Sequence, residues 1–147
     1  FALYGQLTQL VGFDPTSRAI AHQVSARNVA WVDQMADLSG FDVQETQWKT
    51  LEQQAKSLRG LLNEVGRMYA PALLANAQAF QAAEKSWQAE IDGAIWSQQT
   101  FPYQVKCLKW INQGYLSLSS EDRARVDQVL EGTGCEALVS GELFAEA

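Results

Sequence analysis

The strongest constraint on the fold is a long run of apolar residues at helical spacing in the middle of the chain. The run begins at Trp48 and ends at Tyr69, with alternating steps of three and four residues, which place every member on one side of an α-helix. Three heptads that include an alanine lie near the lower limit for a coiled coil, so we expect antiparallel packing within a helical bundle rather than a coiled-coil partner. Pro71 interrupts the pattern and predicts a kink or a restart of the helix. The members of the run are Trp48, Leu51, Ala55, Leu58, Leu62, Val65 and Tyr69.

The opening segment, FALYGQLTQL, has apolar residues at the same spacing and predicts a helix packed against a core. No capping residue precedes Phe1, although the first turn of a helix leaves four backbone amides without partners. We therefore expect that the chain is truncated at its N-terminus. Phe1, Leu3 and Tyr4 are then expected to fray or to bind a neighbouring chain.

Capping residues mark the starts of several later helices. Asp14 is a typical N-cap residue, and Pro15 follows it at the first helical position, where a missing amide costs nothing. Ser25 is a candidate cap for the next helix, and a further helix is expected after Pro102. Ser119, with an acidic residue three positions later, predicts another start. The glycines expected to end helices are Gly40 and Gly132.

A different pattern occupies residues 87–98. Asp92 and Gly93 separate two runs of alternating polarity, which is the strongest short-range sequence signal for a two-residue β-hairpin turn. This turn pairs Ile91 with Ala94 and places the apolar residues of both strands on one face. Because an isolated hairpin is marginally stable in water, we expect this face to pack on the helices. Its members are Trp87, Ala89, Ile91, Ala94 and Trp96.

These patterns together predict a mainly α fold. We expect a bundle of about six to eight helices with one small β-hairpin near residues 87–98. The 147 residues, of which 47% are hydrophobic and 19% charged, suffice for a globular core. We see no linker or internal repeat, so residues 1–147 are predicted to form a single domain.

The composition argues against several classes of partner. The net charge is −6 and the eleven Lys and Arg residues are dispersed, which argues against binding of nucleic acid. No apolar stretch approaches the roughly 20 residues that a membrane span requires, so we expect no membrane insertion. The two cysteines are too few for a disulfide framework, and we therefore expect reduced thiols and a cytoplasmic location.

Residues that carry chemistry are sparse. His22 is the single histidine, and neither cysteine lies near it at a metal-site spacing, so the sequence predicts no metal site and no catalytic constellation. Cys135 is the candidate reactive thiol, because Thr133 and Glu136 have capping-box spacing and would place it in the first turn of a short helix. Acidic neighbours oppose thiolate formation. A small side chain buried at the end of the fold is therefore the favoured interpretation.

Several aromatic residues are candidates to line an apolar pocket, although core packing accounts for most aromatic side chains in a bundle. Asn76 is a polar residue within the apolar segment LLANAQAF, and is either a satisfied core amide or a pocket contact. Trp96 and Trp110 belong to the same aromatic set. The candidate substrate-binding residues are Tyr4, Tyr69, Asn76 and Tyr103.

Two segments, FALYGQLTQL and ARNVAWVDQM, resemble in this order the C-terminal helical domain of the glutathione S-transferase superfamily. The segments GRMYAPALLANA, FPYQVKCLKWI and GTGCEAL look similar to the C-terminal extension of a subset of uncharacterised bacterial members. In that family a Ser-x-x-Asp capping box precedes the opening helix, and Phe1 falls directly after the position of its Asp. The family's catalytic Ser, Tyr or Cys lies in an upstream thioredoxin-like domain, so no catalytic residue carries over to this chain.

The resemblance implies that this chain is the hydrophobic co-substrate-binding and dimerisation half of a glutathione S-transferase-like enzyme. Alone it is expected to be inactive. Glutathione would be the co-substrate of the parent protein, a small apolar electrophile the ligand, and the parent a homodimer. The alternative is a non-catalytic helical binding or interaction module on the same scaffold. A third possibility is a redox role for Cys135.

Overall fold

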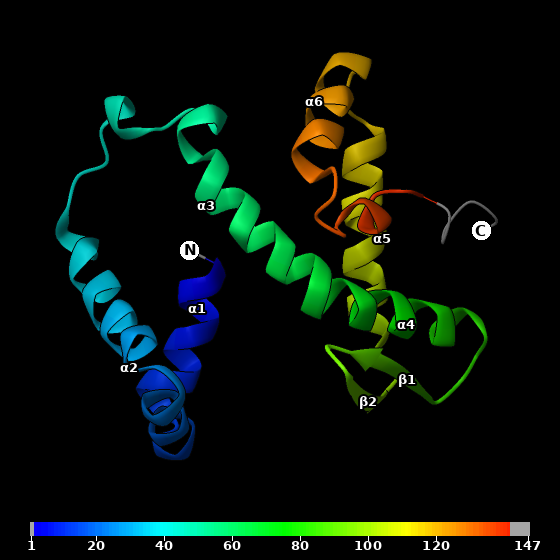
Figure 1. Ribbon diagram of the computed structural model, residues 1–147, viewed down its shortest axis with the longest axis horizontal. Coiled ribbons are helices and arrows are strands. Elements are labelled where there is room, and N and C mark those ends of the chain that lie inside the picture. Colours follow the sequence, from blue (N-terminus) through cyan, green and yellow to red (C-terminus); the bar gives the residue numbers. More distant parts are fainter. Residues whose placement is uncertain (1, 142–147) are drawn as a thin grey trace. The chain divides into compact units, whose positions relative to one another are not determined.

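The computed structural model describes residues 2–141 and is mainly helical, with one small antiparallel sheet. Contacts group the chain into two compact units, Phe1–Trp48 and Lys49–Ala147 (Figure 1). The prediction of one family domain over residues 1–147 stays a prediction. Within the described residues, no helix combines the length and the apolar character that a membrane span needs.

The first unit contains α1 (Ala2–Thr8), the π-helical turn η1 (Gln9–Phe13) and α2 (Pro15–Asp37), followed by the short 3₁₀ segments η2 (Leu38–Gly40) and η3 (Glu45–Gln47). A helix near the N-terminus is thus confirmed, although its apolar face is only partly buried. Leu3 and Leu10 are half exposed, and Phe1 lies outside the described residues. The small core of this unit comprises Val11, Val29 and Val32, with Tyr4, Leu7 and Ala21 packed against it.

The predicted cap of α2 is confirmed. The Asp14 carboxylate accepts hydrogen bonds from the backbone amides of Thr16 at 2.8 Å and Ser17 at 3.1 Å, and Pro15 occupies the first helical position. Ser25 lies inside α2 with extended backbone angles, φ −160° and ψ 96°, so the two predicted helices join across a kink at this residue.

The second unit begins with a long helix assembled from α3 (Leu51–Glu64), the π-helical turn η4 (Val65–Tyr69) and α4 (Ala70–Gln81). In the π turn the Ala70 amide donates to the carbonyl of Val65, five residues back. This wide turn lies directly before Pro71, which has no amide to donate and would crowd a preceding carbonyl in a regular α-helix. The predicted interruption at Pro71 therefore takes the form of a π turn within one continuous helix.

This continuity corrects the predicted number of helices. Because α3, η4 and α4 run on as one and α2 joins two predicted helices across the kink at Ser25, the described residues form five continuous helices rather than six to eight. The side chains of the predicted apolar run are also buried to different extents. Leu62 and Val65 pack against the main core, whereas Trp48 and Leu51 are 71% and 58% exposed.

The predicted hairpin is present as β1 (Ser86–Ile91) and β2 (Ala94–Gln99), which pair antiparallel. Asp92 and Gly93 have φ values of 52° and 76°, and two positive values in succession are typical of a type I′ turn. The register pairs Ile91 with Ala94, as predicted. Trp87 and Ile91 are buried against α4, whereas Ala94 and Trp96 are exposed, so the predicted apolar face packs on a helix through its β1 half only. Figure 1 shows the hairpin beside α4.

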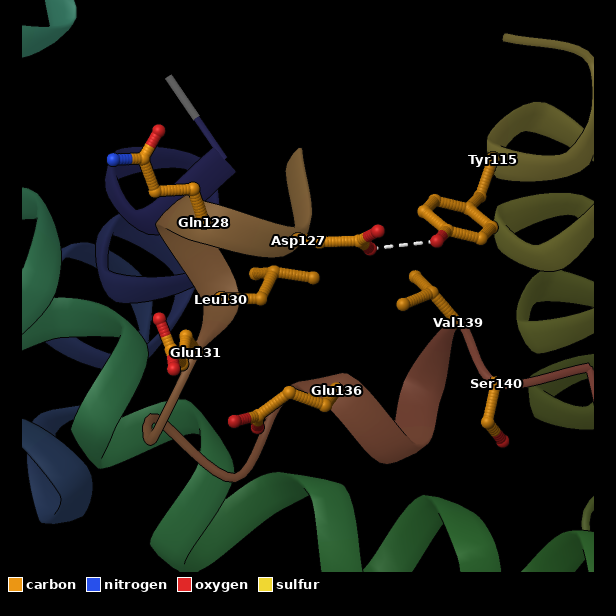
Figure 2. Close-up of a pocket in the computed structure, with 8 residues that line it drawn as sticks. All are labelled: Tyr115, Asp127, Gln128, Leu130, Glu131, Glu136, Val139 and Ser140. Carbon is orange, nitrogen blue, oxygen red and sulfur yellow. Dashed lines mark hydrogen bonds between the residues drawn. The ribbon is translucent and has the colours of Figure 1, made fainter. Parts of the chain in front are cut away.

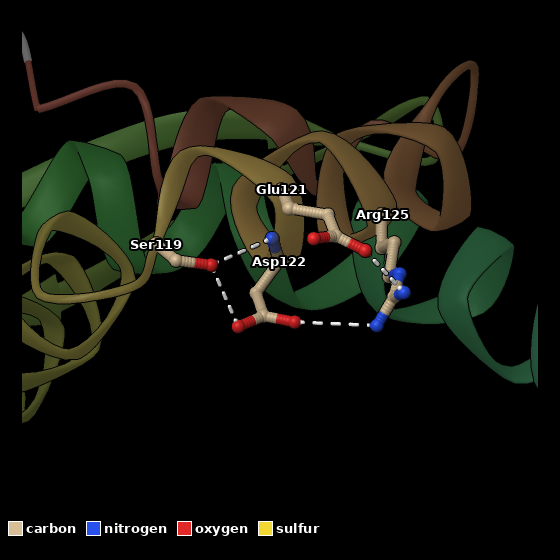
Figure 3. Close-up of polar contacts among 4 residues, drawn as sticks. All are labelled: Ser119, Glu121, Asp122 and Arg125. Carbon is tan, nitrogen blue, oxygen red and sulfur yellow. Dashed lines mark hydrogen bonds and ion pairs between the residues drawn. The ribbon is translucent and has the colours of Figure 1, made fainter.

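The remaining elements are α5 (Pro102–Leu116), α6 (Ser120–Leu130) and the 3₁₀ turn η5 (Glu136–Leu138). Ser119 caps α6 as predicted, because its hydroxyl accepts from the Asp122 amide at 3.1 Å and donates to the Asp122 carboxylate at 2.8 Å (Figure 3). Arg125, one turn further on, pairs with Glu121 at 2.6 Å on the exposed side of the same helix (Figure 3). The main core of this unit comprises Ala70, Leu73, Ala77, Val105, Leu108, Cys135 and Leu138.

After α6 the chain turns back through Gly132 and Gly134, which have φ values of +70° and +80°. This loop lies against the π turn, where a Cβ placed on Gly66 would be 1.9 Å from the carbonyl oxygen of Thr133. Glycine at position 66 is therefore required for the two backbones to approach this closely.

Candidate functional site

An apolar hollow of about 230 Å³ lies where the hairpin, the π turn and the beginnings of α4 and α5 meet. We term this hollow the hairpin pocket. Apolar and aromatic side chains make up most of its lining, as is usual for sites that bind small molecules. The lining residues are Met68, Tyr69, Ala72, Leu73, Trp87, Ile91, Trp96, Gln98 and Gln104.

The hairpin forms one wall of the pocket. Trp87 pairs with Gln98 across the strands, and residues at alternate positions of a strand share one face, so Trp96 lies on the same face as both. Trp87 and Ile91 are only 6% and 3% exposed and anchor this face on the helix. Trp96 is 46% exposed, so this lining residue remains open to solvent.

The long helix and α5 form the rest of the pocket. The π turn contributes Met68 and Tyr69, and the first turn of α5 contributes Gln104. The start of α5 is held by Asn76 of α4, whose side-chain amide donates to the Phe101 carbonyl and whose side-chain oxygen accepts from the Phe101 amide. Asn76 therefore positions the segment that carries Gln104 without lining the pocket itself.

The polar groups of the pocket are uncharged. The lining residues that carry a polar side-chain group are Gln98, Gln104, Tyr69 and Trp87. The Trp87 nitrogen is buried and has no hydrogen-bond partner in the described part of the chain. This lining suits a small molecule that is mainly apolar.

The cationic residue closest in sequence to the pocket lining is already paired with carboxylates. Arg67 precedes Met68, and its guanidinium pairs with the Asp92 carboxylate at the hairpin turn and with Glu64 at 2.6 Å. The hydrogen bond with Asp92, followed by the one with Glu64, raises the pKa of Arg67 above its ordinary value. Arg67 thus stays charged and ties the hairpin turn to the π turn.

The structure places the predicted substrate-binding residues in different environments. Tyr69 lines the hairpin pocket, together with Trp96 of the predicted aromatic set. Asn76 is fully buried as a satisfied core amide. Tyr103 is 58% exposed and packs against Phe101 at a ring-centroid distance of 6.3 Å, and Tyr4 belongs to the first unit.

Seven of the nine lining residues were not predicted as site residues, among them Trp87, Gln98 and Gln104. Trp87 and Gln98 carry a recognisable signal, since the Asp-Gly turn fixes the register that pairs them. Gln104 carries no such signal, because its position depends on how α5 docks on α4.

The Cys135 thiol is buried, which is the interpretation that its sequence context favours. It is 4% exposed, and its Sγ donates to the Leu62 carbonyl at a distance of 3.3 Å. The Thr133 hydroxyl accepts from the Cys135 amide at 3.2 Å and donates to the Leu130 carbonyl, so Thr133 stabilises the turn. The helix that follows is the three-residue η5, which begins only at Glu136.

A second hollow, of about 410 Å³, lies between α5, α6 and η5 (Figure 2). Tyr115 of α5 and Asp127 of α6 point toward each other across it, and the tyrosine hydroxyl donates to the carboxylate at 2.6 Å (Figure 2). This hydrogen bond raises the pKa of Tyr115. Glu131 and Glu136 also line this hollow, which makes it acidic.

Two acidic residues of this second hollow, Asp127 and Glu136, are engaged in hydrogen bonds within the chain. The Glu136 carboxylate accepts a hydrogen bond from the Gly132 amide. Its own backbone amide lowers the pKa of Glu136 most, against an opposing effect of burial, and the amides of the Gly132–Gly134 loop lower it further. Over residues 2–141, no group of three or more His, Cys, Asp or Glu side chains is arranged to hold a metal ion.

Comparisons of the chain with protein-family models, curated proteins and solved structures find no match.

Proposed function

We propose that this chain binds a small, mainly apolar molecule in the hairpin pocket. The observation that carries the proposal is the pocket itself, in which Tyr69, Trp87 and Trp96 surround a hollow of about 230 Å³. Burial of apolar ligand surface supplies most of the binding free energy in such sites, and a few polar groups fix the orientation of the ligand.

In the full parent protein, we propose, this binding serves a glutathione S-transferase-like reaction. The family resemblance supports that role, in which this chain presents the electrophile and an upstream domain binds and activates glutathione. The same resemblance supports a homodimeric parent. A cytoplasmic location is supported by Cys107 and Cys135, which are both free thiols.

A non-catalytic binding module is the alternative function, and the environment of Cys135 argues against a redox role in either case. The one thiol with a candidate chemical role is buried and donates to a backbone carbonyl, which is a structural arrangement. Glutathione conjugation by the full native gene product separates the two functions. Conjugation supports the transferase, whereas its absence in a folded full-length protein that still binds apolar molecules supports the module.

Binding to the hairpin pocket is tested with toluene as the probe, in a titration of the full chain followed by NMR. We expect shifts of the Trp96 and Tyr69 signals and about a tenfold loss of affinity in Trp96→Ala, since one aromatic wall of the site is lost. Trp110→Ala is the matched control, because Trp110 is similarly exposed, at 50%, and packs under Lys106 of the same helix. Equal loss in both variants, or no saturable shift at all, contradicts the proposal.

A further inference from the structure

We infer that the hairpin pocket selects an uncharged ligand that carries an amide group beside an apolar ring, and that it rejects a carboxylate of the same shape. This inference rests on the proposed function, because it names the class of molecule that the pocket takes.

The polar part of the lining matches an amide. Gln98 and Gln104 each present a carboxamide, which offers two N–H donors and one carbonyl acceptor. Neither side chain has a hydrogen-bond partner within the described residues, so both remain able to bind a ligand. A ligand amide has the same two kinds of group in the opposite arrangement, and a carboxamide pairs with it through both.

The charges around the pocket oppose an anion. No charged side chain lines it, and transfer of a carboxylate from water to such a site is costly unless a cation compensates. Arg67 is engaged by two carboxylates, those of Glu64 and Asp92, so this cluster carries a net charge of about −1. Arg67 is therefore not free to compensate the charge of a carboxylate ligand.

The test compares three probes of similar size on the full chain: benzamide, benzoate and toluene. Benzamide and benzoate have the same shape, and benzoate is ionised at neutral pH. We expect benzamide to bind at least about tenfold more tightly than benzoate, as measured by calorimetry or NMR titration at pH 7. Toluene is expected to bind to all of the variants described below. Its binding shows that the pocket is still folded in each variant.

Two variants assign the selectivity to the carboxamides. Gln98→Leu and Gln104→Leu are each expected to lower the affinity for benzamide by about threefold to tenfold, with toluene affinity retained or increased. Gln99→Leu is the matched control, since Gln99 follows Gln98 on β2 and lies on the opposite face of the hairpin. It is expected to leave the affinity for benzamide unchanged.

The outcomes separate this inference from the proposed function. Benzoate that binds as tightly as benzamide overturns the inference, and so does a benzamide preference that persists undiminished in both glutamine variants. In either case toluene binding leaves the proposed function in place. If none of the three probes binds, the proposed function itself fails, and the inference fails with it.

Discussion

Asn76 and Phe101 are joined by two hydrogen bonds that connect the middle of α4 to the start of α5. The Asn76 side-chain nitrogen donates to the Phe101 carbonyl at 3.0 Å, and the Phe101 amide donates to the Asn76 side-chain oxygen at 2.8 Å. Asn76 is completely buried. This pair answers the question of whether Asn76 is a core amide or a pocket contact, because both ends of its side chain are used to hold the backbone.

Replacement of this amide is expected to destabilise the second unit. Asn76→Leu removes both hydrogen bonds and leaves the Phe101 amide and carbonyl without their partner, at a cost of about 2–3 kcal/mol. Urea unfolding followed by circular dichroism measures the loss. Gln78→Leu is the control on an exposed position of the same helix and is expected to change stability by less than about 0.5 kcal/mol. Equal effects of the two substitutions would contradict the role given to Asn76.

Replacement of two helical glycines by alanine is expected to change the stability of the protein in opposite directions. In Gly66→Ala the new methyl would lie 1.9 Å from the Thr133 carbonyl oxygen, so the backbone has to move, and we expect a loss of about 1–3 kcal/mol. At Gly60 a Cβ meets no atom within 4 Å, so Gly60→Ala is expected to stabilise α3 by roughly 0.5–1 kcal/mol. Thermal unfolding of the two variants gives the comparison. A Gly66→Ala protein as stable as the parent would show that the two backbones are not in close contact.

The two cysteines are expected to differ in reactivity. Cys135 is buried and donates to Leu62, whereas Cys107 is partly exposed on α5. Iodoacetamide should therefore modify Cys107 in the native protein and Cys135 only after unfolding, as followed by mass spectrometry. Rapid native modification of Cys135, at or above the rate of a model thiol, would revive a redox role for this residue.

The Glu136 carboxylate is expected to make stability depend on pH. Backbone amides lower its pKa in the folded state below the ordinary value of 4.5, so its stabilisation is fully present above that value. It is lost as the pH falls from there through the lower pKa of the folded state. Glu136→Gln should accordingly destabilise the protein at pH 7, with a difference that shrinks below pH 4.5. Urea unfolding at several pH values tests this, and a difference that stays constant or grows in acid would contradict it.

The features that were predictable from the sequence are those fixed by neighbouring residues. The Asp92–Gly93 turn determines the register of the hairpin within a few residues on either side, and the register was correct throughout. The caps at Asp14 and Ser119 are equally local, since each binds amides two or three residues away. Such interactions depend little on the rest of the fold.

The features that were not predictable depend on residues far apart in the chain. The partner of Asn76 is 25 residues away, so the sequence left its role open. The number of helices was overestimated because the chain passes Pro71 through a π turn and Ser25 through a kink, and the pattern alone does not distinguish either from a break between two helices. The hairpin pocket needs α5 docked on α4, which no local signal specifies.

The π turn at Val65–Tyr69 has a consequence for how this segment tolerates change in length. Each residue of an α-helix advances the chain by about 100° around the axis, and a π turn accommodates one additional residue at the same place. Because the wider turn absorbs that residue locally, α4 keeps nearly the facing relative to α3 that a regular helix one residue shorter would give it. Deletion of a single residue within Val65–Tyr69 is therefore expected to leave Ala72 and Leu73 facing the hairpin, whereas a deletion within α4 turns every later residue by about 100° around the axis. The π turn is thus the place in this helix where a change of one residue in length disturbs the pocket least.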